Sequence, residues 1–136
     1  MALPLWPDVA RGEMRIVPLG GIPNLFSMNL RIDQLGVFFV LLTAGVGLGT
    51  LQYARGYFGP KSSRLFWSAL LAFMGAMIGL ALADSLILLF VFWELTTITS
   101  FLLIGMNFDQ AESRRGAVQS FLVTGSGGLA LLAGIA

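Results

Sequence analysis

The sequence predicts an all-α, polytopic membrane protein with four transmembrane helices and a short N-terminal extracytoplasmic arm. Of its 136 residues, 57% are apolar and only 11% are charged, whereas soluble domains carry about 25% charged residues. Four long apolar runs follow the first 33 residues, and each could cross a bilayer. We therefore expect a multi-pass protein of the cell inner (plasma) membrane, with an arm over 1–33 and a transmembrane part over 34–136.

Composition also excludes several classes of function. The chain has no histidine and no cysteine, which excludes disulfides, thiolate chemistry and metal or haem sites built on those side chains. The net charge of +1 comes without a basic patch, so nucleic acid is not an expected partner. No nucleophile–base pair is evident. We expect no catalytic residues, no cofactor and no bound metal, and a lipid bilayer around the chain.

Residues 1–33 form the only extended polar stretch. Two short β-prone segments, 15–17 and 25–32, are separated by prolines and glycines that are typical of turns. A small hairpin on the membrane surface and an irregular tail are equally good interpretations of this arm.

The first two predicted spans cover residues 35–54 and 65–83. Both are uncharged, and a helix of 20 residues is about 30 Å long, the thickness of the hydrocarbon core. In each span two glycines stand four residues apart, a spacing that lets helix backbones approach closely: Gly45 with Gly49, and Gly75 with Gly79.

The third predicted span, 86–106, carries a single acid, Glu94, and the fourth, 116–136, is uncharged and rich in glycine. Asp84 comes just before the third span. We interpret it first as the N-cap of that helix, because aspartate is a favoured N-cap residue. It is also a candidate secondary acid near the membrane face.

Glu94 is the main candidate for a functional residue in this sequence. A carboxylate near the middle of a bilayer costs at least about 2.5 kcal/mol. Thr97 and Ser100 share one side of the helix with it, and Thr96 and Thr99 widen this polar sector. The carboxyl group can be protonated or stay charged beside a cation, yet no span contains one. We expect Glu94 to exchange protons. The alternative for Glu94 is a structural acid that forms a hydrogen bond with a neighbouring helix. The alternative for the hydroxyl groups is hydrogen bonding to the backbone of their own helix.

The basic residues predict the orientation. Five lie in the loops after the first and third spans, and three lie in the arm, where acids balance them. Short cytoplasmic loops carry the excess of Lys and Arg. The face with the larger number is therefore expected to be cytoplasmic: Arg55, Lys61, Arg64, Arg114 and Arg115.

The stretch FVFWELTTITSFLLIG, residues 90–105, resembles the antiporter-like membrane subunits shared by Mrp-type multisubunit Na+/H+ antiporters, respiratory complex I and membrane-bound hydrogenases. Residues 28–39, 80–90 and 113–134 extend the resemblance, although Gln34 stands where the family usually has glycine. The sequence of residues 93–105 is most similar to that of the large A subunit of Mrp antiporters. The resemblance covers about residues 25–136 and implies a fragment that contains the third to the sixth helix of such a subunit.

This resemblance implies part of a proton-translocating membrane subunit of a monovalent cation (Na+)/H+ antiporter. Glu94 corresponds to the fifth-helix glutamate that relays protons in the family, where it pairs with a seventh-helix lysine that these residues lack. The implied partners are other subunits of a multisubunit membrane complex, protons and Na+. One alternative is a proton-pumping subunit of an NADH:quinone oxidoreductase or hydrogenase; another is a truncated, non-transporting structural fragment. We expect a transporter subunit rather than an enzyme.

Overall fold

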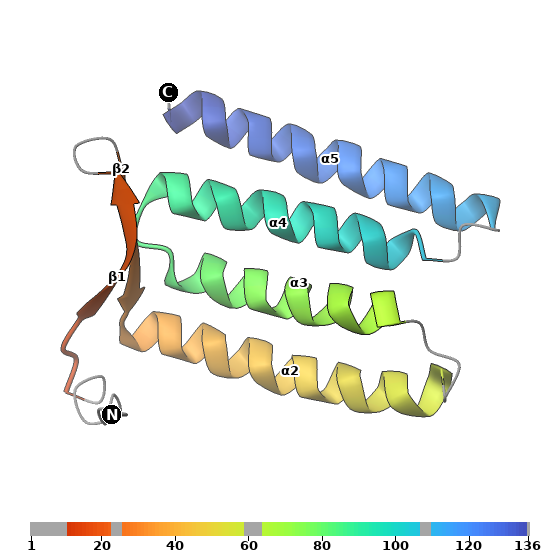
Figure 1. Ribbon diagram of the computed structural model, residues 1–136, viewed down its shortest axis with the longest axis horizontal. Helices are drawn as coiled ribbons and strands as arrows, with labels where there is room; N and C mark the ends of the chain where they lie inside the picture. The colour runs from red at the N-terminus through yellow and green to blue at the C-terminus, as the bar shows by residue number, and fades with distance from the viewer. Residues whose placement is uncertain (1–10, 23–25, 59–63, 107–109, 136) are drawn as a thin grey trace.

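A hairpin of two strands is followed by four helices that lie side by side in chain order (Figure 1). The computed structural model describes residues 11–22, 26–58, 64–106 and 110–135. Each helix is long and apolar enough to cross a membrane, which confirms the predicted polytopic, all-α fold. The helices are α2 (Gln34–Phe58), α3 (Arg64–Leu82), α4 (Leu86–Ile104) and α5 (Ala111–Ile135).

Two of the helices extend beyond the uncharged runs that predict the spans. α2 continues past Arg55, and α5 includes Glu112 and Arg114, which the sequence suggested would lie in a loop. Long charged side chains can reach the membrane interface while their backbone stays helical. The polar loop that was expected after the third span includes Asn107 and Asp109, which lie outside the described residues.

The described part of the arm is an antiparallel hairpin of β1 (Arg15–Ile22) and β2 (Phe26–Ile32). The sequence suggested that Pro18 and the glycines after it would separate the strands. Instead β1 continues, with a shift in register between Pro18 and Gly20. Gly20 has a φ of +124°, which glycine adopts without steric penalty because it has no Cβ. An irregularity of this kind accommodates the extra residue without ending the strand.

The hairpin is attached to the bundle at the junction between α3 and α4. The Asp84 amide donates a hydrogen bond to the Asn29 carbonyl at 3.2 Å, and Leu30 forms an isolated antiparallel bridge with Ala83. The hairpin therefore lies at the end of the bundle where α2 begins and α3 ends (Figure 1).

Asp33 joins the hairpin to α2. Its Oδ1 accepts a hydrogen bond from the Gly36 amide at 2.7 Å, which caps the first turn of α2. Its Oδ2 accepts one from Arg31 Nη2 at 3.0 Å. The Gly36 amide and then the Arg31 guanidinium hold the pKa of Asp33 below its usual value of 3.8.

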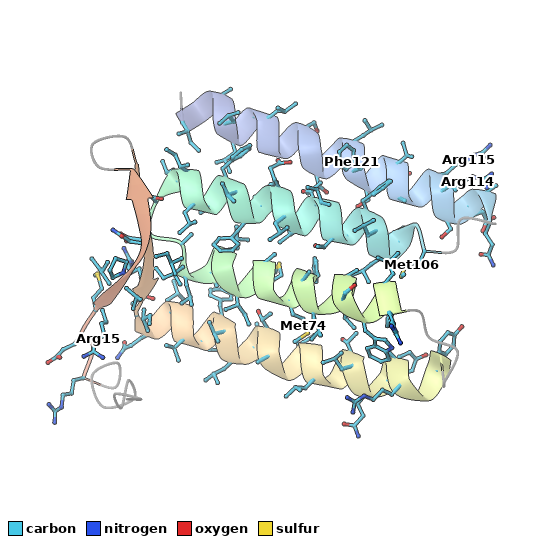
Figure 2. The ribbon with its side chains drawn as sticks, in the orientation of Figure 1. Arg15, Met74, Met106, Arg114, Arg115 and Phe121 are labelled. Atoms are coloured by element: carbon cyan, nitrogen blue, oxygen red, sulfur yellow. The ribbon has the colours of Figure 1, made fainter. Side chains whose placement is uncertain are left out.

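Two glycines lie directly against a large side chain of the neighbouring helix. Gly47 of α2 faces Met74 of α3, and Gly79 of α3 faces Phe92 of α4; a Cβ at either glycine would overlap that side chain. Figure 2 labels Met74. The four-residue spacing of the two glycine pairs indicated that helix backbones could approach closely at these residues. Within this chain one of the four, Gly79, makes such a contact, and three have open space beside them: Gly45, Gly49 and Gly75.

Candidate functional site

Glu94 lies near the middle of α4, eight residues after Leu86 and ten before Ile104. At a rise of about 1.5 Å per residue, it is roughly 12 Å from one end of the helix and 15 Å from the other. α4 packs between α3 and α5 (Figure 1), and the Glu94 side chain is half-buried. The carboxyl group is therefore at the depth of a bilayer centre if α4 spans the membrane.

The Glu94 carboxylate is directed at α5. Its Oε1 occupies the space in which a Cβ of Gly128 would stand, and Gly128 is itself buried. Beside it, Trp93 Nε1 donates a hydrogen bond to the Thr124 carbonyl across the interface at 3.3 Å. Thr124 precedes Gly128 by four residues, about one helical turn. The tryptophan and the glutamate thus contact successive turns of the same face of α5.

Towards the other end of the interface, apolar and polar contacts continue the pairing of α4 with α5. The rings of Phe101 and Phe121 pack edge to face with centroids 5.6 Å apart; Figure 2 labels Phe121 on α5. The Ser113 hydroxyl donates a hydrogen bond to the Ile104 carbonyl at 2.7 Å. These contacts fix the antiparallel register in which Glu94 meets Gly128.

The threonines of the predicted polar sector are buried. The exposed fractions of Thr96, Thr97 and Thr99 are 8%, 2% and 4%. Thr96 and Thr97 both donate to the Trp93 carbonyl, at 2.7 and 3.1 Å, and Thr99 donates to a carbonyl one turn earlier in α4 at 2.7 Å. Ser100 is half-buried. These threonine hydroxyls satisfy the backbone of their own helix, which is the structural alternative for such residues.

Asp84 is not the N-cap of α4, and this corrects the first interpretation of that residue. The cap is Ser85, whose Oγ accepts a hydrogen bond from the Leu88 amide at 3.2 Å. Serine caps helices as well as aspartate does, and the bond between the Asp84 amide and Asn29 holds that residue in the chain segment before the helix. Asp84 is exposed and remains only a candidate secondary acid.

Among the described residues, the cations lie towards the helix ends and in the N-terminal arm. Arg114 and Arg115 are 14 and 13 residues before Gly128 in α5, a distance of about 20 Å along the helix. They are at the opposite end of the bundle from Arg15 (Figure 2). Within the described ranges, no group of three or more acidic, cysteine or histidine side chains could hold a metal ion.

Three residues of this site were not identified from the sequence: Trp93, Thr124 and Gly128. Trp93 is next to Glu94 in the chain, but its partner is a backbone carbonyl of α5, and no side-chain pattern predicts such an acceptor. Gly128 was one of several glycines in an apolar segment. Its role depends on which face of α5 meets α4.

Comparison with known proteins agrees with the resemblance. Residues 83–136, which include α4 and α5, match the family described as "NADH:quinone oxidoreductase/Mrp antiporter, TM". The chain is 44%, 41% and 39% identical over 131 residues to proteins of Staphylococcus epidermidis, Staphylococcus saprophyticus and Staphylococcus aureus, each named "Putative antiporter subunit mnhA2". The predicted resemblance to antiporter-like membrane subunits is therefore confirmed, as is the multi-pass location in the plasma membrane.

The similarity covers most of this chain and a small part of each relative. The alignment includes 94% of the chain but only 16% of each relative's length. The chain therefore spans about one sixth of the length of the relatives that it matches.

Proposed function

We propose that this chain, whose residues 83–136 match the antiporter membrane family, forms the proton-binding part of a monovalent cation (Na+)/H+ antiporter subunit. The observation that carries the proposal is Glu94, an acid at the centre of an apolar helix and half-buried against α5. Intramembrane acids are costly and are functional-site candidates by default.

The chemistry follows from the surroundings of the carboxyl group. No Lys or Arg of the described helices lies at its depth, so a charged Glu94 would need compensation from elsewhere. A protonated Glu94 needs none. A cation brought to this depth by another segment or subunit would favour release of the proton, and its departure would favour uptake. Such alternation is the elementary step of a proton relay.

The partners belong to the same proposal. The relatives are named as antiporter subunits, which supports assembly of this chain with other subunits of a membrane complex. Na+ is proposed as the counter-transported ion on the resemblance of residues 90–105 to subunits of Mrp-type Na+/H+ antiporters. The matching family is also described by NADH:quinone oxidoreductase, so a redox-driven proton pump is the second candidate. The names of the relatives favour the antiporter.

Replacement of Glu94 by glutamine tests the proposal. The amide has the size of the acid but cannot release a proton, so we expect Na+-driven proton movement to fall by at least about tenfold. The complete complex that contains the variant chain would be placed in everted membrane vesicles, and the pH gradient would be followed by quenching of an acridine dye when Na+ is added.

Two matched variants serve as controls. Glu112→Gln removes an exposed acid in the first turn of α5 and should leave exchange unchanged. Asp84→Asn tests the candidate secondary acid. Because Asp84 is exposed, we expect this variant to lower exchange less than Glu94→Gln does. Normal exchange by the Glu94→Gln complex would refute the proposed role.

A further inference from the structure

The contact between Glu94 and α5 depends on a single missing side chain. The buried positions of α5 are Ala117 and Gly128. At Gly128, the position that a Cβ would take overlaps Glu94 Oε1 and is 3.1 Å from Glu94 Cδ and 3.3 Å from Trp93 Cδ1. Any side chain at residue 128 would have to displace the carboxylate.

The other glycines nearby do not have this relation to the acid. A Cβ at Gly125 would meet nothing within 4 Å, and one at Gly127 would make an ordinary contact of 3.8 Å with Trp93 Cζ2. Helix packing alone would not require glycine at 125. The requirement at 128 comes from the carboxylate, since its oxygen is the atom that overlaps the Cβ position.

The distance between the two helices is held at the same level. Trp93 Nε1 bonds the Thr124 carbonyl at 3.3 Å, so α5 cannot move away from α4 here without losing this hydrogen bond. The carboxylate therefore has a space of defined size, bounded by the Trp93 ring and the Gly128 backbone.

We propose that Gly128 is a positioning residue for Glu94: the absence of a side chain at 128 directs the carboxyl group into the α4–α5 interface and away from the lipid. This inference rests on the proposed role of Glu94 as the proton-binding group. The inference adds Gly128 of α5 as a residue that sets the location of the Glu94 carboxyl group.

The test measures the reactivity of Glu94 directly. The 136-residue chain would be placed in lipid nanodiscs and treated with dicyclohexylcarbodiimide, which adds to protonated carboxyl groups in an apolar medium. Mass spectrometry gives the labelling rate at Glu94 as the pH is raised from acid to alkaline, with Glu94→Gln as the blank. We expect Gly128→Ala to raise the rate at least about fivefold and to shift its pH profile, because the overpacked carboxylate must turn towards the lipid.

Gly125→Ala is the matched control and should label as the native chain does. Glu94→Asp provides a second arm, because aspartate is one methylene shorter and leaves room for the alanine Cβ. Adding Gly128→Ala to Glu94→Asp should therefore change the labelling rate much less than adding it to the native chain. Should Gly128→Ala alone fail to fold, recovery of helicity in the double variant supports the same steric pairing.

The outcomes separate this inference from the proposed function. In one outcome the native chain labels, and Gly128→Ala and Gly125→Ala show the same rate and the same pH profile. That result would overturn the positioning role and leave the proposed function of Glu94 standing. A native chain that labels no faster than Glu94→Gln would overturn both. Misfolding of both the single and the double Gly128→Ala variants would also overturn the positioning role, because a group other than the carboxylate would then block the Cβ.

Discussion

At the scale of single residues, the most informative contrast is between two acids in different surroundings. Asp33 has a cation and a helix amide beside it, and both stabilise its charged form. Glu94 is placed in an apolar helix with the backbone of Gly128 as its neighbour. The first arrangement is typical of a structural cap, and the second makes Glu94 a candidate for a functional acid.

The cap at Asp33 makes a prediction about pH. Its pKa in the folded chain is below the usual 3.8, so the stabilisation it provides is complete above that value and is lost as the pH falls through the folded pKa. In an NMR titration, the Gly36 amide resonance should move with a midpoint below 3.8.

In Asp33→Asn the same resonance should not titrate in this range, because asparagine caps the helix without a charge. A midpoint at or above 3.8 in the native chain would contradict the stabilising role of Gly36 and Arg31.

At the scale of elements, each interface between consecutive helices contains a glycine opposite a large side chain of the neighbouring helix. The pairs are Gly47 with Met74, Gly79 with Phe92, and Gly128 with Glu94. Without a hydrophobic driving force between helices in lipid, close van der Waals contact contributes much of their association. The first two pairs are apolar packing, and the third places an ionisable group in the same kind of contact.

Gly79 gives an element-scale prediction. An alanine there would overlap the Phe92 ring, so we expect Gly79→Ala to lower the free energy of unfolding by about 1–3 kcal/mol. Gly75→Ala is its control in the same helix, because the space beside Gly75 is open. Denaturant titration in mixed micelles, followed by far-UV circular dichroism, measures both. Equal stability of the two variants would show that the α3–α4 contact can relax.

At the scale of the whole molecule, the row of helices separates two ends of different character. The hairpin and the α3–α4 junction lie at one end, and Arg114 and Arg115 lie at the other (Figures 1 and 2). The distribution of basic residues predicts that the arginine end is cytoplasmic.

This orientation can be measured because the chain has no cysteine of its own. Glu13→Cys and Gln110→Cys would each introduce one thiol at an exposed position, one at each end. A membrane-impermeant maleimide added to intact cells should label the first variant at once and the second only after permeabilisation. The reverse pattern would refute the predicted topology.

Much of this fold could be predicted from the sequence because bilayer thickness imposes length and apolarity on every span. The four helices, the isolated acid and the basic ends are properties of a linear pattern. The N-cap at Ser85 and the continuation of β1 past Pro18 were not predicted, since each depends on contacts with Asn29 or other residues of the hairpin. Local propensity at those positions favours several outcomes, and tertiary contacts select one.

From the sequence alone we could predict four helices that are long and apolar enough to cross a membrane, with one costly acid near the middle of the third. The physical reason is that burial in lipid selects residue types along the chain, whatever their neighbours. The packing of the helices, which the sequence does not show, places Glu94 Oε1 against Gly128 of α5 and leaves open space beside Gly45 and Gly49. Those facts depend on the rotation and register of each helix against the next, which the contacts of side chains across the interfaces determine.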